Sequence, residues 1–133
     1  MRTLTRQTRE QIRAAVQRRC AGIAAANDCE LNFILEPGYP STINDAKMAE
    51  YVEQVARQAL GADRYVPAAR PVMGGEDFAY YLENVPGCFF MIGTIPPGCE
   101  QYHPLHSDRY DFTDGALAVG IRMFVELALN FGK

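Results

Sequence analysis

The chain has 133 residues, of which 48% are hydrophobic and 22% charged, which excludes a disordered or fibrous protein and suits one domain of ordinary size. The formal net charge of -3 argues against a general binder of polyanions, although six arginines face one glutamate in the first nineteen residues. No stretch approaches the roughly 18 consecutive apolar residues of a membrane span, and no secretory leader is recognisable, so we expect a cytoplasmic protein without a membrane partner.

The N-terminal quarter is expected to form a strand, a helix and a second strand. Residues 1–5 look like a short strand. Apolar side chains then recur at helical spacing, at Ile12, Val16 and Ile23. Thr5 or Thr8 could cap this helix, and Asn27 ends it. In residues 29–36, apolar and polar side chains alternate, which predicts a strand with one buried face.

Two further elements follow the run of backbone breakers "PGYPS", at which we place a domain boundary. Asn44 can cap a second helix that Gly61 ends. A short strand is expected near Val66. The run "CFFMIG", residues 88–93, is apolar without alternation, which is typical of a central strand covered on both faces.

The glycine pair Gly74 and Gly75 precedes a short predicted helix. Free backbone N–H groups at a helix start suit an anion such as a carboxylate. The alternative is a tight turn, because Glu76 and Asp77 would repel an anion unless they point away.

A long loop, residues 94–111, carries both histidines and leads to a last helix from Thr113 to Gly132. That helix is apolar nearly all round, so we expect it to be buried. Loops of this length between buried elements are often functional.

The loop gathers side chains that are common metal ligands, namely His103, His106, Asp108 and Asp111. Spacing alone favours the alternative that they are solvated loop residues, because two histidines three apart outside a helix have no fixed geometry. The four cysteines form no C-x-x-C pair, so we expect reduced and mostly buried thiols at Cys20, Cys29, Cys88 and Cys99.

Two segments, "MGGEDFAYYLENVPGCFFMIG" and "HPLHSDRYDFTDGALAVGIRMF", resemble the C-terminal part of metal-dependent amidohydrolases, the family of hippurate hydrolase, aminoacylases, related carboxypeptidases and auxin-conjugate hydrolases. The resemblance extends back through "GYPSTINDAKMAEYV" to the N-terminus. It implies an α/β fold in which residues 1–38 are part of a ferredoxin-like lid and dimerisation domain. Residues 39–133 would be the C-terminal segment of a zinc-peptidase-like catalytic domain.

The resemblance also implies a metal site. Two divalent ions, zinc or manganese, bind in this family, and the histidine of the Leu-His-Ser motif is a ligand, which is His106 here. His103 and Asp111 would then not bind the metal themselves but would hold the loop that carries His106 in position. Gly74 and Gly75 would lie beside the substrate cleft.

Relatives carry a long N-terminal segment with further metal ligands and a glutamate pair that supplies the general base, and none of these is present here. We therefore expect the C-terminal portion of an enzyme that hydrolyses N-acyl amino acids by metal-activated water, and we assign no catalytic residue. The isolated chain is expected to be inactive.

The alternative is a non-catalytic interaction module. Half a lid sheet would expose strand edges, which favours a homodimer or pairing with a full-length relative. We do not expect the arginine-rich helix to bind nucleic acid, because such arginines are usually solvated and no aromatic platform accompanies them.

Overall fold

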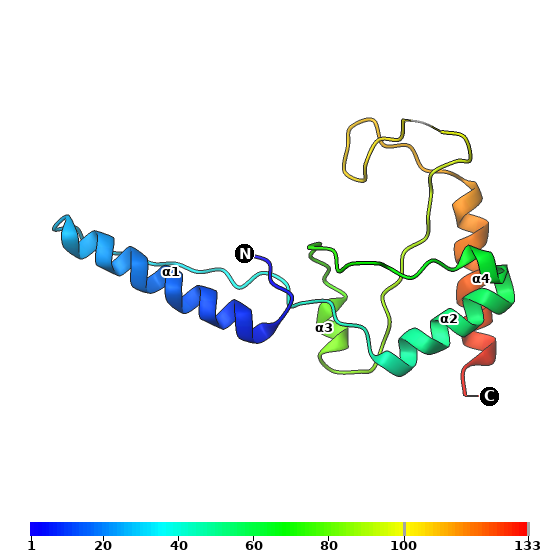
Figure 1. The fold of residues 1–133 in the computed structure, drawn as a ribbon, viewed down its shortest axis with the longest axis horizontal. Helices are drawn as coiled ribbons and strands as arrows, with labels where there is room; N and C mark the ends of the chain where they lie inside the picture. The colour runs from blue at the N-terminus through cyan, green and yellow to red at the C-terminus, as the bar shows by residue number, and fades with distance from the viewer. Residues whose placement is uncertain (100, 133) are drawn as a thin grey trace. The chain divides into compact units, whose positions relative to one another are not determined.

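The computed structural model describes residues 1–99 and 101–132 and consists of helices joined by long irregular segments (Figure 1). In chain order, the elements are α1 (Arg6–Ala26), α2 (Ala46–Leu60), the 3-10 helix η1 (Ala62–Arg64), α3 (Ala79–Leu82) and α4 (Gly115–Asn130). The chain divides into two compact units. Unit one comprises Met1–Asp45 and Ala68–Gly87, and unit two comprises Ala46–Pro67 and Cys88–Lys133.

Helix α1 begins at one of the two caps that the sequence allows. The Thr5 backbone is extended, and the Thr5 hydroxyl oxygen accepts the Thr8 N–H at 3.1 Å. This bond satisfies one of the N–H groups that a helix start leaves unpaired. Asn27 ends the helix, as predicted, and its side-chain amide donates to the Ile23 carbonyl at 2.8 Å.

The chain returns along α1, and both ends of the returning segment are anchored to that helix (Figure 1). The Cys29 N–H donates to the Ala24 carbonyl at 2.9 Å. At the other end, Arg9 Nη2 donates to the Tyr39 carbonyl at 2.5 Å.

The core of unit two lies between α2 and α4. Its buried side chains are Val52, Val55 and Ala56 from α2 and Met123 from α4. The Tyr51 hydroxyl donates to the Leu127 carbonyl at 2.5 Å and adds a hydrogen bond across the same contact. Helix α2 ends where predicted, because Gly61 adopts a φ of 109° that disfavours other residues.

The expected strands are not formed, so the prediction of an α/β fold with a lid remnant is not confirmed. No strand is assigned within residues 1–99 and 101–132, although segments 1–5, 29–36 and 88–93 and the stretch near Val66 were expected to supply them. A strand exists only when its backbone pairs with a neighbour. In residues 29–36 the expected alternation survives in part, since Phe33 and Leu35 are half-buried while Ile34 is 78% exposed.

The expectation that the last helix is buried is wrong in this structure. Only Met123 of α4 is buried, whereas Leu117, Ile121 and Phe124 are each about two-thirds exposed. The run 88–93 is likewise not covered on both faces, because Met91 is 71% exposed. Apolar sequence determines which side chains gain from burial, but burial needs a second surface.

The remaining expectations concern thiols, domain boundaries and membranes. All four cysteines are free, but none is buried as expected, because Cys20 and Cys88 are half-buried and Cys29 and Cys99 are exposed. The division at residues 38 and 39 stays a prediction. Across the described residues, no helix combines the length and apolar character that crossing a bilayer requires.

Candidate functional site

Both histidines lie on the exposed loop of unit two, at the first of two consecutive turns, with His103 directly before that turn and His106 within it. The Ser107 N–H donates to the Pro104 carbonyl at 3.0 Å, and the Tyr110 N–H donates to the Ser107 carbonyl at 3.1 Å. The side chains of His103 and His106 are exposed. The loop therefore presents its imidazoles outward rather than using them to pack unit two.

His106 has an unusual backbone conformation. Its φ is 73°, in the left-handed region that residues with a side chain rarely adopt. This conformation costs an L-residue about 1 kcal/mol. Such strain in a non-glycine residue gathers at functional positions more often than elsewhere.

The base of the loop is closed by a group of hydroxyls that we call the latch, made of Thr94, Tyr102, Tyr110 and Thr113. The Tyr102 hydroxyl donates to the Asp111 carbonyl at 2.6 Å and lies 3.3 Å from the Thr94 hydroxyl. The Thr94 hydroxyl lies 3.2 Å from that of Tyr110, and the Thr113 hydroxyl donates to the Thr94 carbonyl at 2.6 Å. The latch ties the two ends of the loop together.

Two further features of the latch follow from its geometry. The hydrogen bond with the Thr94 side chain lowers the pKa of Tyr102, because it stabilises the phenolate. The Tyr110 ring packs edge-on against Tyr102, with centroids 5.7 Å apart, and against Phe112, with centroids 4.8 Å apart. The sequence interpretation missed Thr94 and Tyr102, although the spacing of tyrosines around the histidines was a signal.

The described residues do not assemble a metal site by themselves. Within residues 1–99 and 101–132, no three side chains among His, Cys, Asp and Glu come together closely enough to hold an ion. A stable zinc site needs three or four convergent ligands. The imidazole of His106 is of a type that binds zinc, but the described residues supply it with no cluster of further ligands.

Gly74 and Gly75 lie in unit one, in the segment before α3. The helix starts four residues later than the pair, at Ala79, so the glycines do not open it directly as predicted. A side chain at Gly75 would be 3.4 Å from the Tyr39 ring and 3.8 Å from the Arg2 guanidinium. These are ordinary van der Waals distances, so the neighbouring groups would accommodate a Cβ at this position.

Arg2 is a neighbour of the glycine pair that the sequence interpretation did not single out. Its Nη1 donates to the Met73 carbonyl at 2.7 Å, directly before the pair. The guanidinium thus places one positive charge beside Gly75, whereas a carboxylate oxygen of Glu76 would lie 4.0 Å from a Cβ at Gly74, so the repulsion of an anion expected from Glu76 is not removed. Nothing in the sequence around Arg2 distinguishes it from the other arginines of this end.

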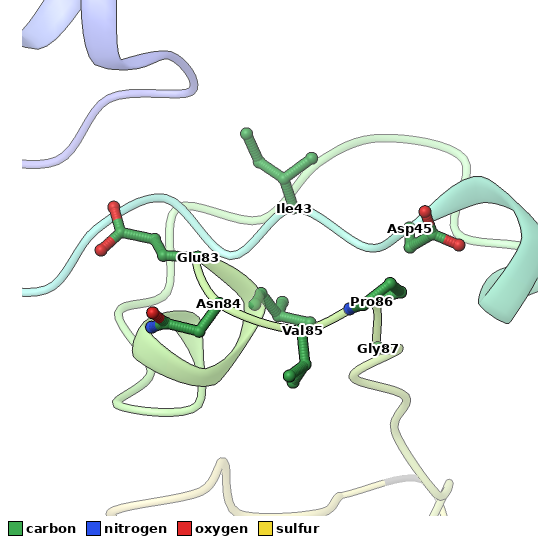
Figure 2. Close-up of a pocket in the computed structure, with 8 residues that line it drawn as sticks. Ile43, Asp45, Glu83, Asn84, Val85, Pro86 and Gly87 are labelled. Atoms are coloured by element: carbon green, nitrogen blue, oxygen red, sulfur yellow. The ribbon is translucent and has the colours of Figure 1, made fainter.

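Unit one also contains a hollow of 330 Å³ between the segment before α2 and the end of α3 (Figure 2). Its lining includes Ile43, Asp45 and residues 82–87. The Asp45 N–H donates to the Gly87 carbonyl at 2.9 Å and closes one side. The hollow carries carboxylates of Asp45 and Glu83 but no basic side chain.

Comparison with known proteins identifies the family. The model of peptidase family M20/M25/M40 matches residues 5–130. The chain belongs to this peptidase family. Among curated relatives, N-acetyldiaminopimelate deacetylase of Enterococcus faecalis is 33% identical over 91% of this chain and 30% of its own length. Hippurate hydrolase of Campylobacter jejuni is 28% identical over 100% of this chain and 33% of its own length. Thermostable carboxypeptidase 1 of Saccharolobus solfataricus is 31% identical over 79% of this chain and 25% of its own length.

These relatives confirm the predicted resemblance to amidohydrolases, hippurate hydrolase and carboxypeptidases. The chain spans a third or less of the length of each relative named above. Peptidase family M20/M25/M40 is a family of hydrolases whose members are generally metal-dependent.

Proposed function

We propose that this chain is the C-terminal portion of a metal-dependent amidohydrolase whose complete form hydrolyses the amide bond of N-acyl amino acids. The observation that supports this most strongly is the family match over residues 5–130. Two relatives are named for reactions on acylated amino compounds, the hippurate hydrolase and the N-acetyldiaminopimelate deacetylase.

In this proposal, His106 is a metal ligand and the latch holds its loop. A zinc or manganese ion would supply activation of water when bound in the complete enzyme. His103 and Asp111 would position the loop, which fits the hydrogen bond that the Asp111 carbonyl accepts from Tyr102. Gly74 and Gly75 would lie beside the substrate, with backbone N–H groups available to a carboxylate.

The isolated chain is expected to show no hydrolysis, because one ligand does not fix an ion and no general base is assigned. Purified chain would be incubated with zinc or manganese and N-benzoylglycine, and released glycine would be measured. Turnover that disappears in His106→Ala but persists in His103→Ala would contradict the expected inactivity of the isolated chain.

The proposal as a whole is tested on the native polypeptide, using an antibody raised against α4. A band much larger than 14.8 kDa is expected, and in that longer protein His106→Ala should abolish hydrolysis and bound metal together. Loss of hydrolysis with metal content unchanged would overturn the assignment of His106. A native band at 14.8 kDa would overturn the amidohydrolase proposal and favour the alternative below.

We propose as the alternative a non-catalytic module that pairs with a second copy or with a full-length relative. The accessible surface of the chain is 10962 Å². A compact monomer of this mass would expose only about 7,000 Å². The excess is of the size that permanent complexes bury.

Part of this excess is apolar and lies on α1, where Ile23 is 66% exposed. Light scattering across a hundredfold range of concentration should show a dimer that Ile23→Lys weakens. Gln17→Lys adds the same charge to α1 and is the matched control. A folded chain that remains monomeric throughout the range would rule out self-pairing.

A further inference from the structure

Three arginines of α1 border a second hollow in unit one, with a volume of 370 Å³. Arg6, Arg9 and Arg13 follow each other at spacings of three and four residues, so their side chains share one face of the helix. The opposite wall comes from residues 37–41 and from α3, including the Tyr80 side chain. The hollow is thus basic on one wall and mostly uncharged on the other.

The charges around this hollow do not cancel. Glu10 and Glu83 are its two acidic lining residues. Glu10 Oε1 lies 3.3 Å from Arg13 Nη1 and neutralises that arginine. The guanidinium of Arg6 forms no hydrogen bond or ion pair with any residue that the structure describes. Of the remaining charged lining residues, Arg6 and Arg9 are positive and Glu83 is negative, so the hollow has one positive charge in excess.

Arg9 supplies a more specific signal. Its Nη2 donates to the Tyr39 carbonyl at 2.5 Å, which fixes the side chain along the wall. Its Nε is buried and has no hydrogen-bond partner among the described residues. Buried N–H groups are almost always paired, so the Arg9 guanidinium keeps hydrogen-bonding capacity that the described residues do not use. A guanidinium presents its N–H groups as a fork that matches the oxygens of a carboxylate or phosphate.

We propose that this hollow is a binding site for a small oxyanion, with the guanidinium groups of Arg6 and Arg9 as its donors. The ligand's shared chemistry is a planar or tetrahedral group of negatively charged oxygens, supplied by a carboxylate or by a phosphate. Binding does not depend on the hydrolytic function, because neither His106 nor the glycine pair lines this hollow.

The test is a titration of the isotope-labelled chain with sodium acetate and, separately, with sodium phosphate at constant ionic strength. The Arg9 Nε–H signal and the Tyr80 amide are followed by NMR. We expect saturable shifts with at least one of the two anions. The anion that binds more tightly shows whether the site prefers a carboxylate or a phosphate. Loss of a charge-assisted hydrogen bond should weaken binding at least about tenfold in Arg6→Gln.

Two variants complete the test. Arg9→Lys retains the charge but removes the fork, and it should also weaken binding about tenfold. Arg18→Gln removes the same charge as Arg6→Gln from α1, outside the hollow, and should change the affinity less than twofold. Circular dichroism checks that α1 is intact in each variant. If Arg9→Lys also breaks the hydrogen bond with the Tyr39 carbonyl, the proposal is judged on the affinity of Arg6→Gln. Linear, unsaturated shifts with both anions, or equal weakening by Arg18→Gln, would overturn the proposal.

Discussion

The left-handed conformation of His106 is the residue-scale feature that connects stability with the candidate site. Its φ of 73° is strained for any residue with a Cβ and most strained for a β-branched one. We expect His106→Val to lower the free energy of unfolding by about 1–2 kcal/mol. His106→Gly should leave it within about 0.5 kcal/mol, because relief of strain offsets the greater flexibility of the unfolded chain. Urea denaturation followed by circular dichroism measures both values.

His103→Val is the matched control, since His103 is an exposed histidine of the same loop and is not among the non-glycine residues with positive φ. It should change stability by less than about 0.5 kcal/mol. Equal losses in His103→Val and His106→Val would mean that valine disturbs the loop irrespective of the backbone angle. The sequence motif pointed to His106, but it contained no signal for the backbone strain.

At the scale of elements, the contact between α2 and α4 holds unit two together. Met123 is 2% exposed and is the side chain through which α4 enters the core. Met123→Ala should destabilise unit two by about 2–5 kcal/mol, because it removes buried methylenes and leaves a cavity. The measurement is the protection of α2 and α4 amides against hydrogen exchange.

Ile121→Ala is the control for this prediction, since Ile121 lies on the same helix and is 66% exposed. Its effect should stay within about 0.5 kcal/mol. A similar loss of protection in both variants would show that α4 is stabilised by a surface other than its contact with α2.

The helices were predictable because their determinants are local. The Thr5 cap, Asn27 at the end of α1 and Gly61 at the end of α2 act through neighbours within four residues. The strands were not, because the pairing that defines them joins segments distant in sequence. Among the site residues, His106 could be named from its motif, whereas the approach of Arg2 to Gly75 joins residues more than seventy positions apart.

At the scale of the whole molecule, the chain buries less surface than its mass predicts. It exposes 10962 Å². An unfolded chain of this mass would expose about 21,000 Å² and a compact fold about 7,000 Å². Because the urea m-value scales with the surface exposed on unfolding, we expect an m-value about a quarter below that of a compact domain of 133 residues.

An m-value equal to that of a compact domain would contradict this expectation and would mean that the exposed apolar side chains are covered in solution. The comparison is made at the lowest usable protein concentration, because self-association also buries surface. Addition of a covering partner should raise the m-value.

The sequence by itself determined where the long helices lie, the family and the choice of His106 as the candidate ligand, because these depend on local spacing and on motifs. Only the tertiary structure decided that Met123 is buried while its neighbours on α4 are not, and that the Tyr102 hydroxyl closes the histidine loop. It also decided that Arg9 keeps an unpaired, buried N–H. These features depend on which distant segments meet, and that is a property of packing rather than of local sequence.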